Sequence, residues 1–216
     1  MTAILCYGDS NTWGYTASTQ ARMGRWERWP GVVQRELGDD IHVIEEGQNG
    51  RTTVFDVPFE TYRNGLTHLP VSLQTHHPLD AVIIDLGTND LFLPGVNAYH
   101  VARGAMKVAE VVLTSDTGPA GTAPKVLVII PPPFAALPGF DVNESPNAAS
   151  ESERFSQAFV DAAAAAAEWE GMVIPVLDLR DHISSSSVDG IHFEVEDHAV
   201  IGSAIAGRLR ELLDLG

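Results

Sequence analysis

The sequence predicts an α/β fold in which a parallel sheet is covered by helices on both faces. Three observations predict it. Five short apolar runs are typical of strands, longer segments with helical spacing separate them, and a length of 216 residues suits a single domain, residues 1–216. Strands that alternate with helices form parallel sheets, because a crossover segment must carry the chain back before the next parallel strand can begin.

The predicted strands are short and almost continuously apolar, which is typical of strands buried on both faces. A five-stranded sheet of this kind favours the flavodoxin-like order 2-1-3-4-5, a three-layer sandwich. Ligands of such sheets bind beyond the carboxyl ends of the strands, so the residues that follow each run are where chemistry is expected. The runs are AILCY (3–7), IHVIEE (41–46), AVIIDL (81–86), KVLVII (125–130) and MVIPVLDL (172–179).

Helices are predicted by apolar side chains at helical spacing and by residues that start and stop helices. In WPGVVQRELG, Pro30 lies in the first turn and Gly38 ends the helix. Ser150 is the predicted N-cap of an alanine-rich helix. The predicted helices span residues 29–38, 97–115, 151–169 and 194–213.

Two segments fit neither pattern and are predicted to be loops. Residues 15–28 follow the first strand, and the Pro-rich residues 131–150 follow the fourth. Both leave the sheet at its carboxyl side, where they can wall a pocket or form contacts between subunits. Exposed apolar loops tend to become interfaces, so we expect a homo-oligomer.

The charge of the chain restricts its partners. The formal net charge is −16, from 13 Lys and Arg against 29 Asp and Glu. Such a chain repels nucleic acid and anionic membrane surfaces, so the expected partner is a small neutral substrate. A single cysteine cannot form an internal disulfide, and no signal peptide or run of 18 apolar residues is visible. These features predict a cytoplasmic location.

Polar side chains with complementary chemistry follow the predicted strands. Gly8-Asp9-Ser10 follows the first run, GQNGR (47–51) the second and GTND (87–90) the third, and Asp189-Gly190-Ile191-His192 lies some distance after the fifth. Because the carboxyl ends of parallel strands meet at one edge of the sheet, we expect these residues to lie together. They supply a hydroxyl, amide donors, a carboxylate and an imidazole, which are the groups that nucleophilic acyl transfer requires.

Each of these groups has a candidate role. The Ser10 hydroxyl is a weak nucleophile and needs a base, which His192 can provide near neutral pH. Asp189, three residues earlier, can orient the imidazole and stabilise its charged form. The oxyanion needs preorganised donors, and the candidates are the Ser10 N–H, the Gly50 N–H and the Asn89 side-chain amide.

Aromatic side chains near these motifs are candidates for the substrate pocket. They are Trp13, Phe134 and Phe193, and ordinary packing is the alternative interpretation for each. No phosphate-binding glycine motif is present, and the adjacent His76 and His77 point in different directions on a regular element. We therefore expect neither a cofactor nor a metal.

Asp85 lies inside the otherwise apolar third run. An unpaired buried carboxylate is costly, so this side chain is expected to face a polar partner. The sequence assigns it no functional role.

The sequence resembles the SGNH, or GDSL, hydrolase superfamily in four blocks: GDSNTWG (8–14), Gly50 within EEGQNGRTT, GTND (87–90) and DGIH (189–192). It is most similar to the bacterial arylesterase/acyltransferase group, through ILCYGDSNTWG, VIEEGQNGRTT, APKVLVIIPPP and VDGIHF. The resemblance runs from residue 4 to about residue 193. It implies a Ser10, Asp189 and His192 triad, an oxyanion hole that includes Gly50 and Asn89, no metal or organic cofactor, and a homo-oligomer.

These observations together predict a serine esterase. It would hydrolyse short-chain, acetyl-type aryl or alkyl esters through an acyl-enzyme and transfer the acyl group to alcohols. A carbohydrate acetylesterase with the same triad is one alternative. A non-catalytic flavodoxin-like binding module is another, from a different functional class.

Overall fold

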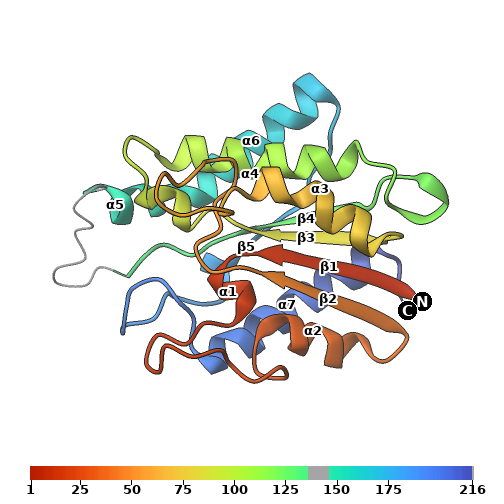
Figure 1. The fold of residues 1–216 in the computed structure, drawn as a ribbon, viewed down its shortest axis with the longest axis horizontal. Coiled ribbons are helices and arrows are strands. Elements are labelled where there is room, and N and C mark those ends of the chain that lie inside the picture. The colour runs from red at the N-terminus through yellow and green to blue at the C-terminus, as the bar shows by residue number, and fades with distance from the viewer. Residues whose placement is uncertain (136–145, 216) are drawn as a thin grey trace.

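A five-stranded parallel sheet forms the centre of the computed structural model, which describes residues 1–135 and 146–215. Its order among these residues is β2-β1-β3-β4-β5, which confirms the predicted order 2-1-3-4-5 (Figure 1). β5 is shorter than the predicted run 172–179, because Pro175 precedes it and has no N–H to donate to a ladder. The strands are β1 (Thr2–Gly8), β2 (Ile41–Gly47), β3 (Ala81–Asp85), β4 (Lys125–Ile130) and β5 (Val176–Asp178).

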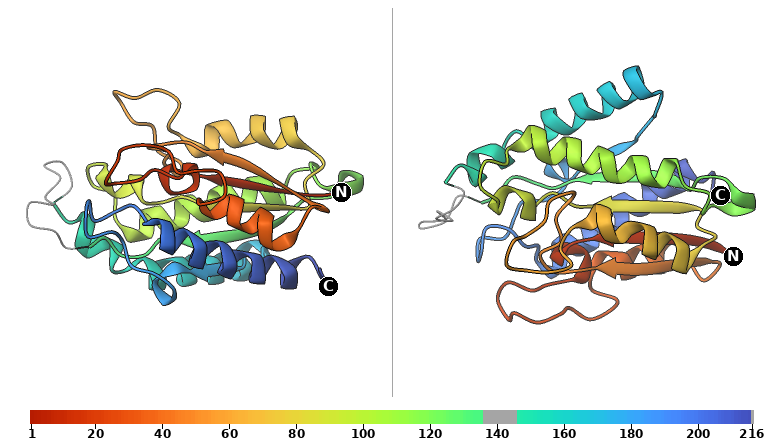
Figure 2. Two further views of the ribbon diagram at one scale, coloured as in Figure 1. Left: turned by 90° about the horizontal axis from the view of Figure 1, so that it is seen from below. Right: turned by 45° about the horizontal axis from the view of Figure 1, so that its top comes forward.

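Helices cover both faces of the sheet, as Figures 1 and 2 show. Along β1, Leu5 and Tyr7 enter the core on one face, while Ile4 and Cys6 enter the core on the other. All four side chains are fully buried, which explains why the strand is apolar at every position. The first face carries α3 (Gly65–His76), α4 (Ala98–Leu113) and α6 (Phe155–Glu170), and the second carries α2 (Trp29–Leu37) and α7 (Val195–Leu212).

The helix α3 is absent from the sequence prediction. Its N-cap is Asn64, whose side chain accepts a hydrogen bond from the Thr67 N–H, and Leu69 and Leu73 bury one face. Pro70 lies inside the helix, where it removes a backbone donor and weakens the helical signal. Burial of the two leucines in the core compensates for this.

The predicted helix 151–169 is interrupted near its start. A short helix, α5 (Ala148–Ser152), precedes α6, which begins only at Phe155. Ser150 therefore lies within α5 and is not an N-cap; its hydroxyl donates to the Asn147 carbonyl at 3.0 Å. Of the predicted loop 131–150, residues 136–145 lie outside the described part of the chain.

Short elements gather at the carboxyl edge of the sheet. They are α1 (Ser10–Trp13), which follows β1 directly, and the 3₁₀ turn η1 (Asn89–Phe92), which follows β3. Two other 3₁₀ turns, η2 (Pro119–Gly121) and η3 (Leu179–Asp181), flank β4 and β5.

No helix within the described residues is long and apolar enough to cross a membrane.

Candidate active site

Ser10 is placed by a tight turn between β1 and α1. The Asp9 side chain caps α1 by accepting a hydrogen bond from the Asn11 N–H at 2.9 Å, which makes Ser10 the first helical residue. Gly8 is required for this turn, because a Cβ there would lie 1.9 Å from the Thr12 hydroxyl and 2.8 Å from the Asp85 carbonyl oxygen. The chain therefore presents the Ser10 hydroxyl at the end of the sheet.

His192 connects Ser10 to Asp189. Its Nε2 lies 2.9 Å from the Ser10 Oγ, and its Nδ1 lies 2.5 Å from the Asp189 Oδ2. The other Asp189 oxygen accepts hydrogen bonds from the backbone N–H groups of Ile191 and His192, each at 3.0 Å. The structure thus brings the three predicted residues into one hydrogen-bonded line, although 182 positions separate Ser10 from His192.

The surroundings of Asp189 favour its ionised form. Burial raises the pKa of this carboxyl. The hydrogen bonds from His192 and Ile191 and the charge of His192 lower the pKa by a larger amount, so it lies below its ordinary value. An ionised Asp189 can stabilise a protonated imidazole. The Tyr15 ring packs against the His192 ring, with the two ring centres 4.4 Å apart.

Asn89 contacts Asp9, the residue before Ser10, and Gly50 lies in the turn after β2. The Asn89 Nδ2 donates to the Arg51 carbonyl at 3.0 Å and to the Asp9 Oδ2 at 3.2 Å. An oxyanion would therefore compete with Asp9 for one of the Asn89 hydrogens. Gly50 has a φ of +74°, and its N–H donates to no described residue.

A pair of residues to which the sequence motifs assigned no role joins the two segments that carry the oxyanion candidates Gly50 and Asn89. Asp90 accepts hydrogen bonds from the Thr53 N–H at 3.0 and 3.1 Å and from the Thr53 hydroxyl. Burial raises the pKa of Asp90 to about 7, although these bonds act in the opposite direction. Each residue lies within three positions of Gly50 or Asn89, and that proximity was the available signal.

Asp85 has the polar partner that its position required. Its Oδ2 accepts a hydrogen bond from the Thr12 hydroxyl at 2.7 Å, which ties α1 to β3. Burial raises its pKa to about 6. The pKa of Asp9 is raised well above its ordinary value, first by burial and then by the charge of Asp85. These two carboxyls support the turn that carries Ser10.

Arg51 is a buried cation at the same edge. Its Nη1 donates to the Gly8 carbonyl at 2.8 Å and to the Glu46 carbonyl, so it joins the ends of β1 and β2. Its guanidinium carbon lies 4.0 Å from the centre of the Tyr7 ring. The sequence motifs give Arg51 no role beyond its place in GQNGR (47–51), whereas in the structure it joins two strand ends at this edge.

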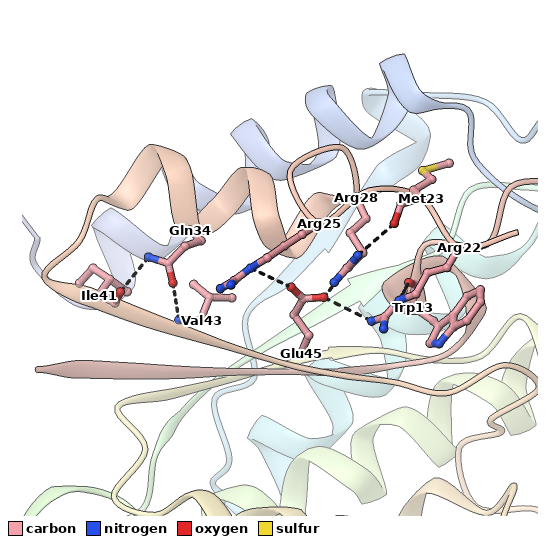
Figure 3. Close-up of polar contacts among 9 residues, drawn as sticks. All are labelled: Trp13, Arg22, Met23, Arg25, Arg28, Gln34, Ile41, Val43 and Glu45. Carbon is pink, nitrogen blue, oxygen red and sulfur yellow. Dashed lines mark hydrogen bonds and ion pairs between the residues drawn. The ribbon is translucent and has the colours of Figure 1, made fainter.

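Trp13 and the loop 15–28 are fixed to β2 by one carboxylate. Figure 3 shows Glu45 among three arginines of this loop: Arg28 forms the tightest contact, Arg22 lies at 3.5 Å and Arg25 at 3.9 Å. Arg22 also donates to the Trp13 carbonyl at 2.8 Å and lies over its ring. Trp13 is half-buried beneath this cation.

A cavity of about 580 Å³ opens beside the oxyanion candidates. Of the predicted pocket residues, Phe134 is buried and stacks on the cavity residue Phe92 at 5.5 Å. Phe193 lies in the core between the sheet and α7, and Trp13 lies under Arg22, so neither lines this cavity. The lining residues are Gly50, Thr52, Val57, Pro58, Phe59, Glu60, Asn89, Phe92, Leu93 and Pro94.

Other features lie apart from this site. His76 contacts the Glu46 carboxylate at 2.9 Å, and within residues 1–135 and 146–215 no three His, Cys, Asp or Glu side chains are grouped to hold a metal ion. A groove of about 450 Å³ between α4 and α6 is lined by Tyr99, Arg154 and Trp169 among others, but by no residue of the Ser10 site.

A doubly wound sheet with Ser10, His192 and Asp189 at its carboxyl edge defines a protein of the SGNH hydrolase class. The GDSL-like Lipase/Acylhydrolase family matches residues 6–200, and the chain belongs to this family. The protein is similar to the solved structure of the M. smegmatis aryl esterase, with 37% identity and a TM-score of 0.87 over 99% of this chain and 100% of that one.

The chain is also similar to a carbohydrate acetylesterase family member from Sinorhizobium meliloti. It is 33% identical, with a TM-score of 0.88 over 100% of both chains. A comparison with curated protein sequences finds no significant match. The solved neighbours therefore include esterases of two kinds, and they cover 99% and 100% of this chain.

Proposed function

We propose that the protein is a serine esterase that hydrolyses short-chain, acetyl-type aryl or alkyl esters through an acyl-enzyme on Ser10. The observation that carries the proposal is the contact of 2.9 Å between the Ser10 Oγ and the His192 Nε2, with Asp189 on the opposite ring nitrogen. Family membership and the two esterase neighbours support it. The proposal includes no metal or organic cofactor.

The reaction follows from these positions. His192 takes the Ser10 proton while the Oγ attacks the ester carbonyl carbon, and the carbonyl π electrons move to the oxygen. The Ser10 N–H, the Gly50 N–H and the Asn89 amide are the proposed donors to that oxyanion. When the intermediate collapses, the bond to the leaving alcohol breaks and His192 returns the proton to it. Water then attacks the acyl carbon with His192 as the base, and the bond to the Ser10 Oγ breaks as His192 returns the proton to it.

The cavity supports acyl transfer to alcohols as a second activity. Its walls are largely apolar, from Val57 to Phe59 and from Phe92 to Pro94, and it reaches Gly50 and Asn89. Bulk water is present at roughly 55 M, so an alcohol competes only where apolar walls concentrate it. We therefore propose that small alcohols accept the acyl group from Ser10.

A test of this activity supplies vinyl acetate and benzyl alcohol in buffer and follows acetate and benzyl acetate together. Early formation of benzyl acetate with ping-pong kinetics is expected. Formation of acetate alone at every alcohol concentration would contradict the transfer activity and leave hydrolysis intact.

The second candidate is a carbohydrate acetylesterase with the same triad, which the Sinorhizobium meliloti neighbour favours. A panel of aryl acetates and acetylated sugars separates the candidates by kcat/KM. A higher value for the aryl acetates is expected. A clear preference for acetylated sugars would assign the protein to the second candidate.

We also propose that copies of the chain associate. Phe59, which lines the cavity, is 95% exposed, and Tyr62, three positions later in the chain, is 71% exposed. Covering such residues stabilises an interface, and the loop 15–28 lies at the same edge of the sheet. The predicted role of residues 136–140 in this contact falls outside the described part of the chain.

A further inference from the structure

The turn that carries Gly50 is held by an arginine from a different segment. We propose that Arg63 is a positioning residue: its guanidinium fixes the orientation of the Asn49–Gly50 peptide, whose N–H is the proposed oxyanion donor. The inference rests on the proposed function, because this N–H has an oxyanion to meet only if Ser10 attacks an ester.

The turn has two possible orientations of its central peptide. The Arg51 N–H donates to the Gln48 carbonyl at 3.1 Å, so Asn49 and Gly50 occupy the two central positions. A φ of +74° at Gly50 is the value for the third residue of a type II turn, whereas a type I turn has about −90° there. The two types differ by a rotation of the central peptide, which exchanges the directions of the Asn49 carbonyl and the Gly50 N–H.

Arg63 selects one of these orientations. Its Nη1 donates to the Asn49 carbonyl, and a Cβ at Gly50 would lie only 3.2 Å from its Nε. The Asn49–Gly50 peptide is trans, so its carbonyl and its N–H point in opposite directions. With the carbonyl directed at Arg63, the N–H is directed away from it. A rotated peptide would lose this bond and turn an N–H toward a cation.

Arg63 is itself fixed on two sides. Its Nε and Nη2 lie 2.8 and 2.7 Å from the Glu60 Oε2, and its backbone carbonyl accepts a hydrogen bond from the Thr52 N–H at 2.9 Å. The planar guanidinium can therefore engage Glu60 and the Asn49 carbonyl at once, which a lysine ammonium on a flexible stem does less well. A charged donor also polarises the peptide and strengthens its N–H as a donor.

The test is the steady-state hydrolysis of p-nitrophenyl acetate by Arg63→Met, Arg63→Lys and the wild type. Because loss of one oxyanion donor costs roughly 10²–10³-fold in kcat, misorientation of one should cost less, about 10- to 100-fold, with KM within about twofold. Arg63→Lys should retain an intermediate kcat. Added guanidinium chloride at millimolar concentration should partly restore Arg63→Met.

Arg154→Met is the matched control, because Arg154 forms the same kind of three-residue-spaced pair with Glu151 on the surface, away from the site. It should keep the wild-type kcat and gain nothing from guanidinium. A transition-state analogue, phenylboronic acid, should bind Arg63→Met more weakly by the factor lost in kcat/KM.

Two results would overturn the inference: a wild-type kcat in folded Arg63→Met, or a rise in KM alone. If Arg63→Met does not fold, the kcat of Arg63→Lys and of Glu60→Gln decides instead, and wild-type values in both would reject the role. The activity of Ser10→Ala distinguishes rejection of the Arg63 role from rejection of the proposed esterase function. An inactive Ser10→Ala beside a fully active Arg63→Met rejects only the Arg63 role.

Discussion

At the residue scale, buried carboxyls hold the backbone at the carboxyl edge of the sheet. Asp9 caps α1, Asp85 accepts from the Thr12 hydroxyl, and Asp90 accepts from Thr53. Burial raises the pKa of all three carboxyls, because the hydrogen bonds that they accept do not fully compensate for the loss of water around a charged group. Ionisation of each carboxyl therefore destabilises the fold. The edge of the sheet is therefore ordered at a cost in stability that depends on pH.

The Asp90 carboxyl allows this cost to be measured. In the unfolded chain it loses its proton near pH 3.8, whereas in the folded protein it keeps the proton up to about pH 7. Between these values the folded state binds more protons, so its stability falls as pH rises. The Asn side chain in Asp90→Asn cannot ionise. The free energy of unfolding of the variant minus that of the wild type should therefore increase by roughly 2–4 kcal/mol as the pH rises across this window.

Urea unfolding of both proteins at intervals from pH 4 to pH 8 measures the difference. Asp85 and Asp9 are present in both proteins, so the difference reports the titration of Asp90 together with the effect of its charge on the pKa of Asp9, which burial raises first and the Asp90 charge raises as well. A difference that stays constant with pH would show that Asp90 does not titrate in this range.

Asn89 should act on the transition state rather than on substrate binding, because its amide meets charge that exists only after attack. Asn89→Ala should lower kcat by roughly 10²–10³-fold and change KM little. Steady-state kinetics with an aryl acetate gives both values. A variant that raised KM and kept kcat would show that Asn89 binds the ground state.

At the element scale, the loop 15–28 is held against β2 by Glu45. The Glu45 and Arg28 side chains are only 13% and 11% exposed, so removal of the carboxylate leaves a buried cation without its partner. Glu45→Gln should lower the free energy of unfolding by about 3 kcal/mol. It should also speed amide hydrogen exchange in residues 15–28 and loosen Tyr15 from His192.

The control for this prediction is Arg25→Gln. Arg25 is 55% exposed and lies 3.9 Å from Glu45, so its removal should change stability by less than about 0.5 kcal/mol. Urea unfolding and hydrogen exchange by mass spectrometry measure both variants. Equal effects of the two substitutions would contradict the central place of the Glu45–Arg28 pair.

The elements and site residues that the sequence predicted share one property: their signal is local. Continuous apolar runs predicted the strands, and Ser10, Gly50 and Asn89 each follow a strand directly. The pairs Thr12–Asp85 and Thr53–Asp90 join segments far apart in the chain, and no local pattern records them.

The cavity, too, could not be predicted from local sequence patterns. It arises where residues 57–60 meet residues 92–94, and neither segment carries a motif. The aromatic residues chosen near the motifs instead fill the core or support the cavity wall from behind, as Phe193 and Phe134 do. Helix α3 is absent from the prediction because Pro70 in its interior disfavours a helix, although Leu69 and Leu73 are buried by tertiary packing.

At the scale of the whole molecule, the exposed side chains of Phe59 and Tyr62 predict self-association. Light scattering of the protein at micromolar concentration should give a multiple of the 23.2 kDa chain mass. Phe59→Ser, at a side chain that is 95% exposed, should shift the distribution toward the monomer and leave the folded state intact. A wild-type mass of 23.2 kDa would contradict the prediction.

The central claim is that Ser10 carries the acyl group between donor and acceptor. Mixing the protein with p-nitrophenyl acetate, quenching in acid within milliseconds and mapping peptides by mass spectrometry tests it most directly. We predict a burst of p-nitrophenol with one acetyl group on Ser10, and a loss in kcat of about 10³-fold or more in folded Ser10→Ala. Acetyl groups only on another residue, or hydrolysis by Ser10→Ala at the wild-type rate, would contradict it.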